Sequence, residues 1–95
     1  TVEVKRDRRW VETGNIYIET SMYSKAIHKW VESGLMTTKA DRWAFVLERL
    51  VFIVTVIDLK NAVDMFGRPI ANDNPPNPSR GFLLRVEDFF KIQRV

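Results

Sequence analysis

The chain contains no cysteine and a single histidine, His28. Without cysteine there is neither a disulfide framework nor a thiolate metal site, and this composition fits a reducing cytoplasm, where we expect the protein to act. One histidine excludes any site that takes two imidazoles from the same chain. A zinc enzyme with one of the usual ligand sets is therefore not expected.

Long hydrophobic runs are also lacking. The longest apolar stretch, LVFIVTVI at residues 50–57, is far shorter than the ~20 residues that cross a bilayer. The amino terminus is polar and has none of the apolar core of a signal peptide, so we expect no membrane partner. Because the first residue is Thr1 and not Met, the chain is expected to be the carboxy-terminal part of a longer one.

The residues that are present are ordinary for one folded domain spanning 1–95. Hydrophobic residues make up 45% and charged residues 28%, as in folded globular proteins. The net charge of +3 and the pI of about 9.5 give a mild bias towards polyanions such as nucleic acid.

The first two segments alternate apolar and polar residues, as half-buried strands do. They are TVEVKRD at residues 1–7 and NIYIETS at residues 15–21. The Thr-Gly-Asn sequence that precedes the second is typical of a turn, so the two predict a β-hairpin with a long basic connection. In such a hairpin Lys5 lies across from about Glu19, and Glu3 shares their face, while the intervening valines, Val2 and Val4, are suited to a core.

The middle of the chain carries mixed signals. Residues 21–36 have helical spacing of apolar residues and predict a short helix or an irregular segment, ended by Ser33-Gly34. Thr38 and Asp41 stand at capping-box spacing. Residues 43–48 and 50–56 are rich in β-formers and predict two strands joined by a turn.

The last part alternates helix, loop and strand signals. Residues 57–67 predict a helix with Asp58 as N-cap and Gly67 at its end. The Pro- and Asn-rich residues 67–80 predict a surface loop, followed by a strand at 81–86 and a terminal helix at 87–94. The expected fold is therefore α+β, with a small mixed β-sheet flanked by helices.

The Glu-x-Lys spacing of Glu3 and Lys5 suits a metal-dependent phosphodiesterase. Mg²⁺ prefers carboxylate and carbonyl oxygens, and a neighbouring lysine can orient the attacking water and offset the charge of the transition state. Glu3 would hold the metal together with the backbone carbonyl of Val4, and Lys5 would point at the water. The plain alternative is a solvent-facing strand, because alternating charged residues and valines are common there.

The wider sequence resembles phage and bacterial members of the PD-(D/E)XK nuclease superfamily. VEVKRDRRWVETGNIYIE followed by SGLMTTKADRWAFVL carries three motifs in order, and the late GFLLRV strand is also similar. The resemblance runs from Thr1 to about residue 66 and again from 80 to 90. It implies a partial restriction-endonuclease-like core and hydrolysis of DNA, with Mg²⁺ as cofactor and Mn²⁺ as the alternative ion.

Carried over by residue, the resemblance gives Glu3 as a metal ligand, Lys5 as the catalytic lysine and Glu19 as the second acidic position. Thr38 and Lys39 would border the nucleic-acid cleft together with Asp41. For these last three the alternative is a helix cap and a solvated face.

A basic stretch follows the Glu-x-Lys pair. Arg6, Arg8, Arg9 and Trp10 are candidates for contacts with phosphates and stacking on a base. They could equally form a salt-bridged surface, with the tryptophan as a lid on the core.

One part of the family pattern is missing. The defining Asp lies on the strand before Glu-x-Lys, and the chain starts at Thr1. An amino-terminal segment or a second copy of the chain would then complete the site. Three readings stay open: a DNA nuclease, a non-catalytic nucleic-acid-binding module on the same scaffold, and a structural or assembly protein.

Overall fold

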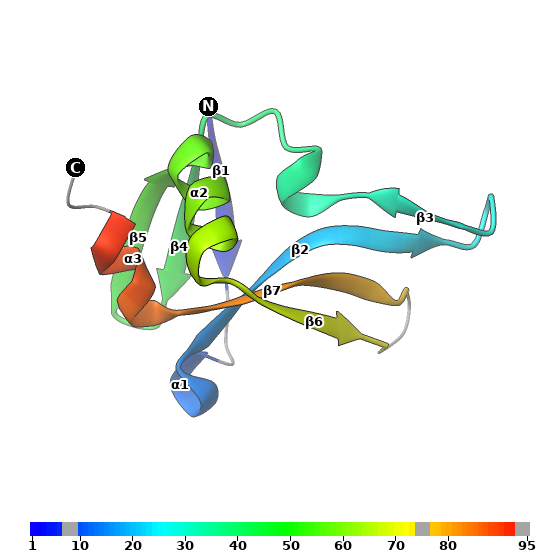
Figure 1. Cartoon of the computed structure of the whole chain (residues 1–95). Helices are drawn as coiled ribbons and strands as arrows, with labels where there is room; N and C mark the ends of the chain where they lie inside the picture. The colour runs from blue at the N-terminus through cyan, green and yellow to red at the C-terminus, as the bar shows by residue number, and fades with distance from the viewer. Residues whose placement is uncertain (7–9, 74–76, 93–95) are drawn as a thin grey trace.

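The computed structural model describes residues 1–6, 10–73 and 77–92, and it contains two β-sheets with helices packed between and beside them (Figure 1). The predicted α+β class is confirmed, but the single mixed sheet is wrong, because the strands divide into sheets of three and four. No helix in the described ranges is long and apolar enough to span a membrane.

The three-stranded sheet has the order β1-β4-β5 and consists of β1 (Val2–Arg6), β4 (Arg42–Leu47) and β5 (Leu50–Thr55). β1 runs parallel to β4, and β4 is antiparallel to β5. The predicted pair of strands at 43–48 and 50–56 is confirmed. Its tight turn contains neither Gly nor Asn, and Glu48 adopts the positive φ of 36° that the turn requires.

The predicted hairpin of the first two strands is wrong, because β1 pairs with β4 and β2 (Asn15–Ser24) belongs to the other sheet. The turn signal at Gly14 is real, and this glycine has a φ of 71°. It ends a short helix instead, α1 (Trp10–Thr13), and its N–H donates to the Trp10 carbonyl at 2.7 Å. A local turn motif therefore did not determine which strand became the neighbour of β1.

The four-stranded sheet is antiparallel throughout, in the order β3-β2-β7-β6. Besides β2 it contains β3 (Lys29–Glu32), β6 (Arg68–Asn72) and β7 (Ser79–Arg85). The strand predicted at 81–86 is thus confirmed, and it begins earlier than expected.

Two predictions about this sheet are wrong. The helical spacing within 21–36 does not form a helix there, because β2 continues to Ser24 and turns back into β3, after which a single 3₁₀ turn, η1 (Gly34–Met36), follows. The expected loop at 67–80 contains β6 and the start of β7. Pro69 is tolerated in β6 because this strand lies at the sheet edge, where a missing N–H breaks no ladder. Residues 74–76 of that segment lie outside the described residues.

Two helices, α2 (Val56–Phe66) and α3 (Val86–Ile92), confirm the predicted helical segments. The N-cap of α2 is Thr55 and not Asp58, because the Thr55 hydroxyl oxygen accepts a hydrogen bond from the Asp58 N–H at 3.1 Å. Gly67 ends the helix as predicted.

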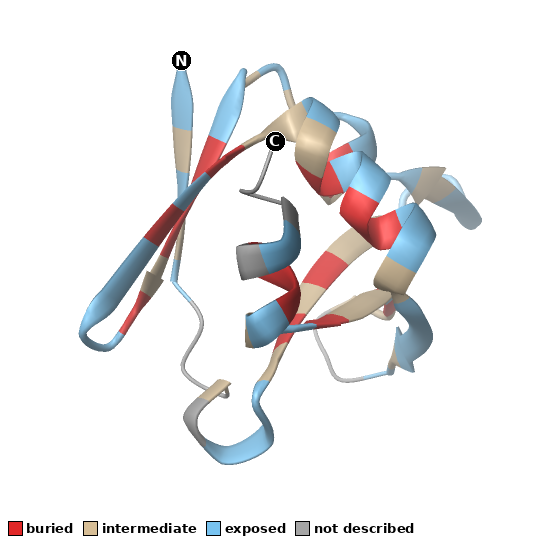
Figure 2. Cartoon of the chain, turned by 60° about the vertical axis from the view of Figure 1, so that its left-hand side comes forward, coloured by how far each residue is buried: buried red, intermediate tan, exposed pale blue. Residues whose placement is uncertain are grey.

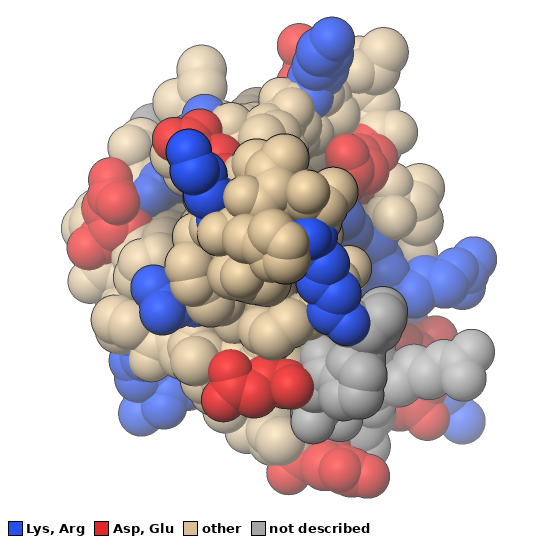
Figure 3. Space-filling model, turned by 90° about the vertical axis from the view of Figure 1, so that its right-hand side faces the viewer, with Lys and Arg blue, Asp and Glu red and all other residues tan. Residues whose placement is uncertain are grey.

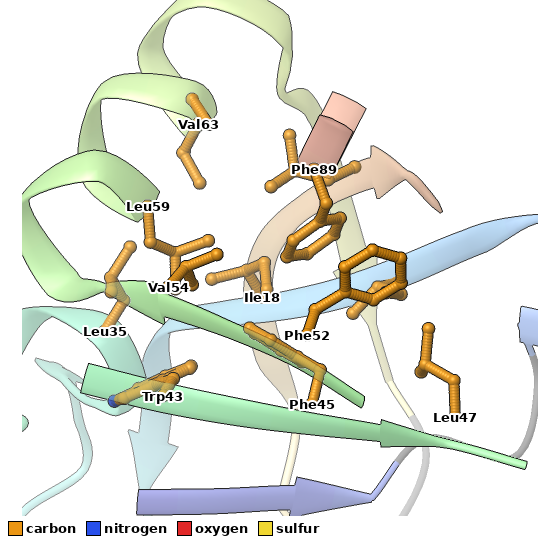
Figure 4. Packing of buried hydrophobic residues seen from close by; sticks show 13 residues of the cluster. Ile18, Leu35, Trp43, Phe45, Leu47, Phe52, Val54, Leu59, Val63 and Phe89 are labelled. Atoms are coloured by element: carbon orange, nitrogen blue, oxygen red, sulfur yellow. The ribbon is translucent and has the colours of Figure 1, made fainter. Parts of the chain in front are cut away.

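The core lies between the inner face of the three-stranded sheet, the two helices and the first half of β2 (Figure 4). At its centre the Phe89 ring lies 5.0 Å from Phe45 and 5.5 Å from Phe52, measured between ring centroids. These aromatic contacts pack α3 against β4 and β5. The candidate site lies between β4 and its other neighbour, β1, at the margin of this core.

The opposite face of the three-stranded sheet, which we call the outer face, is mostly apolar and is uncovered by any described element. The helices lie on one side of this sheet only (Figure 2). The strand register assigns the outer face to six apolar residues, Val2, Val4, Ala44, Val46, Val51 and Ile53, and to Arg6, Arg42 and Thr55 at the strand ends. Four of them, Val2, Val4, Val51 and Ile53, are more than half exposed, at 52–59%.

Candidate active site

Glu3 and Lys5 point to the inner side of β1, and the two valines beside them point outwards. Glu3 is paired with Trp43 and Lys5 with Phe45, and both aromatic residues are buried in the core. Because paired residues in a sheet project to the same side, the two charged side chains face the protein interior at the open margin of the core. The expectation that Val2 and Val4 lie in a core is wrong in the described structure, since they form part of the outer face.

The two charged groups form an ion pair with a hydroxyl behind it. Lys5 Nζ lies 2.7 Å from Glu3 Oε2, and the side chains are 41% and 38% exposed. The Thr38 hydroxyl donates to Glu3 Oε1 at 3.2 Å. Its oxygen accepts from the Trp43 indole N–H at 3.1 Å and from the Ala40 N–H at 3.2 Å. The carboxylate is therefore held from two sides.

This arrangement affects the acidity of the carboxyl group. The hydrogen bond from Lys5 lowers the pKa of Glu3 below its usual value, and the lysine's positive charge and the Thr38 hydroxyl act in the same direction, while burial opposes them. Lys5 Nζ also lies 4.7 Å from the centre of the Trp43 ring, which is a cation–π distance. This contact keeps the ammonium group close to the indole ring.

A pocket of about 210 Å³ opens beside the pair, and Lys5 and Glu19 both line it. The two residues come from different sheets, so their proximity does not arise from the predicted hairpin. The Glu19 carboxylate accepts a hydrogen bond from the Ser33 hydroxyl at 2.8 Å. Behind it, Gly34 approaches so closely that a Cβ at this position would collide with the Glu19 carbonyl, and its φ of 54° also favours glycine.

The Val4 carbonyl points away from β4. The Thr1 carbonyl accepts the Arg42 N–H at 3.2 Å, and Val2 is the register partner of Arg42. In a parallel ladder the carbonyls that bond to the neighbour alternate, so those of Glu3 and Lys5 face β4 and that of Val4 faces the open edge. No strand of the described residues pairs with that edge of β1, so this oxygen could bond to a ligand or to a further strand.

The oxygen donors at this margin are few. Within the described residues no three or more Asp, Glu or His side chains gather into a group that could hold a metal ion. Glu3 and the Val4 carbonyl supply one carboxylate and one carbonyl oxygen, which is the donor chemistry that Mg²⁺ accepts when substrate phosphate and water complete its shell.

The other predicted contacts are spread more widely. Arg6 lines the same pocket as Lys5. Trp10 is partly buried against the core, with an indole N–H that has no described partner, which is the placement expected of a core lid. Arg8 and Arg9 lie outside the described residues. Lys39 is exposed close to the site.

Thr38 and Asp41 do not form a capping box, because no helix starts there. Thr38 binds Glu3 instead, and Asp41 pairs with the Thr1 amino group at 2.7 Å. Sequence reasoning missed the roles of Ser33 and Trp43 as hydrogen-bond donors at the site. Ser33-Gly34 had only been interpreted as a helix stop, and Trp43 as a core residue.

No protein-family model, curated protein or solved structure that we compared matches this chain. The site must therefore be interpreted from its own chemistry.

Proposed function

We propose that this protein is a metal-dependent nuclease that hydrolyses DNA phosphodiester bonds, a member of the PD-(D/E)XK superfamily acting in the cytoplasm of a bacterial or phage-infected cell. The observation that carries the proposal is the orientation of Glu3 and Lys5. A solvated strand would direct its charged residues to water and its valines inwards. Here both charged residues are on the inner side of β1, Lys5 lines a pocket with Glu3 paired to it, and the valines face outwards.

The polar groups in and beside the pocket would each have a role in this reaction. Glu3 and the Val4 carbonyl would hold Mg²⁺, or Mn²⁺ as the alternative ion, and Thr38 would keep the carboxylate in position. When bound, the ion supplies Lewis-acid polarisation of the phosphoryl oxygen and lowers the pKa of a water molecule. Lys5 would orient that water and stabilise the charge that develops on the phosphorus oxygens. Glu19 would hold Lys5 or add an oxygen ligand.

A further carboxylate is needed for a usual two-acid site, and the open edge of β1 is where it would come from. A strand added at that edge, from an amino-terminal segment or from a second copy of the chain, would place a side chain beside Glu3. The accessible Val4 carbonyl supports this, because it lies on the same edge.

The test is cleavage of labelled DNA by the full chain with and without Mg²⁺ or Mn²⁺. Lys5→Ala should lower single-turnover cleavage roughly 100- to 1,000-fold, as loss of one charge-stabilising group does in other enzymes. Lys60→Ala, which removes an exposed cation from α2, is the matched control and should cleave normally. Undiminished metal-dependent cleavage by the Lys5 variant would remove the assignment.

The second candidate is a non-catalytic nucleic-acid-binding module. Two observations favour it: Glu3 is already engaged by Lys5 and Thr38, and no group of three or more Asp, Glu or His side chains in the described residues could hold a metal ion. This module would bind DNA equally well in chelator and in Mg²⁺ and would never cleave it. The same assay, read for binding as well as for cleavage, separates the two.

A further inference from the structure

The β2–β3 hairpin projects from the body of the molecule, beyond the ends of the neighbouring strands (Figure 1). Ser24 is paired with Lys29, and four residues, 25–28, form the turn. His28 takes a φ of 53° to close it. All residues from Lys25 to Trp30 are exposed, although isoleucine and tryptophan are among them.

Positive charge lies on both faces of the sheet at the hairpin, from Lys29 of the hairpin on one face and from Arg80 of the neighbouring strand β7 on the other. Lys25 lies in the turn, and Lys29 begins β3. Lys29 and Trp30 are consecutive in the strand and project to opposite faces. Arg80 of β7 is the register partner of Ser21 and lies over the Trp30 ring. Arg80 is therefore on the same face of the sheet as Trp30, opposite to Lys29.

None of these three cations forms an ion pair with a carboxylate of the described chain. Figure 3 looks onto this end of the molecule, where Lys and Arg side chains lie on either side of an uncharged centre, and acidic side chains are also present. In the projecting residues 21–32, Lys25 and Lys29 outnumber the one acidic residue, Glu32, and Arg80 of β7 adds a further positive charge. The acidic residue of β2, Glu19, lies outside this projecting part.

An aromatic pair holds one cation in place. The Arg80 guanidinium carbon lies 4.1 Å from the centre of the Trp30 ring, and Tyr23 meets that ring edge-on at 5.8 Å. A stacked guanidinium keeps the N–H donors at its rim free for other partners, and its planar fork matches a phosphate. Trp30 is itself 38% exposed.

We propose that the β2–β3 hairpin is a phosphate-binding arm for duplex DNA, in which Lys25 and Lys29 of the hairpin and Arg80 at its base contact the backbone away from the pocket. Beyond Met22, where the pairing with β7 ends, the pairs Tyr23–Trp30 and Ser24–Lys29 and the turn form a short two-stranded tip. A two-stranded β-ribbon fits the major groove of B-DNA. With the tip in the groove, Lys25 and Lys29 would contact phosphates there, and Arg80 would contact a phosphate beside the base of the hairpin.

A single strand, β2, connects the pocket to the tip of the hairpin. From Glu19, which lines the pocket, to Ser24 at the tip, β2 rises roughly 17 Å. That span corresponds to about five nucleotides of one strand of the duplex. The assignment rests on the proposed function only in taking DNA as the polymer. It does not depend on cleavage, since the arm holds the duplex and leaves the chemistry to the pocket.

The test is fluorescence anisotropy of a short labelled duplex across a salt series, in chelator so that no cleavage occurs. Lys25→Ala with Lys29→Ala should flatten the slope of log K against log salt by up to about two units, because each phosphate contact contributes about −0.9. The same estimate gives a Kd raised about 30-fold near 0.15 M salt. Adding Arg80→Ala should remove about one more unit.

Arg49→Ala with Lys60→Ala is the matched control. It removes the same charge from two exposed positions, in the β4–β5 turn and on α2, and neither position is at the projecting hairpin (Figure 1). This pair should change the slope little. Thermal midpoints of both double variants should stay close to that of the parent protein, since all four positions are exposed.

The outcomes separate the arm from the nuclease. A flatter salt dependence of DNA binding in the hairpin variant, but not in the control variant, supports the phosphate-binding arm. This holds even if the protein never cleaves DNA and the nuclease proposal fails. Equal loss in both double variants, or an unchanged slope in the hairpin variant of a cleaving protein, overturns the arm and leaves the nuclease standing. A parent protein that binds no duplex DNA overturns both.

Discussion

At the scale of single residues, the Glu3–Lys5 pair depends on the groups that hold it. Lys5 lies between the Glu3 carboxylate at 2.7 Å and the Trp43 ring at 4.7 Å, while Thr38 holds the other carboxylate oxygen. A half-exposed ion pair by itself contributes little to stability. Its importance is positional, because the fixed Glu3 carboxylate lies beside a fixed ammonium group that lines the pocket.

The lowered pKa of Glu3 makes a prediction about acid stability. A carboxyl group whose folded-state pKa is depressed contributes stability above its unfolded value, and that contribution disappears as the pH falls through the folded-state pKa. Glu3→Gln should therefore lose less stability than the parent on acidification below about pH 4.5, the usual value for Glu. Thermal midpoints measured from pH 6 to pH 2.5 test this, and parallel curves for the two proteins would contradict it.

Gly34 and Gly14 allow a matched comparison of two glycines with positive φ. Their φ values are 54° and 71°, so alanine costs about 1–2 kcal/mol of backbone energy at either position. Only at Gly34 would the new Cβ also collide with the Glu19 carbonyl, whereas nothing lies within 4 Å at Gly14. Gly34→Ala should destabilise the protein more than Gly14→Ala in urea unfolding. Equal losses would show that β2 moves aside without cost.

At the scale of elements, the start of α2 explains how a correct helix was given a wrong cap. Asp58 lies in the first turn, where a negative charge is favourable, and a residue of this type at such a position resembles an N-cap. The hydroxyl of Thr55, three residues earlier, accepts the Asp58 N–H and ends β5 at the same time. Strand and helix thus meet with no loop between them.

The cap assignment predicts the effects of two substitutions. Thr55→Ala should lower the free energy of unfolding by about 1 kcal/mol, because one N–H of the first turn loses its acceptor. Thr55→Ser keeps the hydroxyl and should cost clearly less. Urea unfolding of both variants is the measurement, and a serine variant as unstable as the alanine variant would show that the methyl group matters and not the hydrogen bond.

At the scale of the whole molecule, the three-stranded sheet is covered on one side only within the described structure (Figure 2). Its inner face carries the aromatic core, whereas its outer face presents exposed aliphatic residues such as Val4 and Val51. A patch of this kind commonly marks a surface that another element or molecule covers. Nothing in the described chain identifies what would cover it.

The two faces should respond differently to substitution. Val4→Thr combined with Val51→Thr should change the free energy of unfolding by less than about 1 kcal/mol, since exposed sites usually shift it by less than ~0.5 kcal/mol each. Phe45→Ala on the inner face should cost about 3–5 kcal/mol. Chemical denaturation of both variants is the test. A large loss in the valine variant would mean that the outer face is buried in solution.

Much of the local structure could be predicted from the sequence. The β4–β5 hairpin, the extent of α2 up to Gly67, the β7 strand and α3 all follow from signals that lie within a few residues of one another. The Glu-x-Lys pair was also identified in this way, because two residues apart on a strand share a face whatever the strand pairs with.

The surroundings of the Glu3–Lys5 pair, in contrast, depend on the tertiary structure. Alternation along β1 separates Glu3 and Lys5 from Val2 and Val4, but it does not say which set faces the protein, and the packing against Trp43 and the β4 strand settles this. Thr38 reaches Glu3, and Glu19 reaches the pocket, because parallel pairing and the two-sheet arrangement bring distant segments together. Such pairings depend on burial summed over the whole chain, and no local signal in the sequence encodes them.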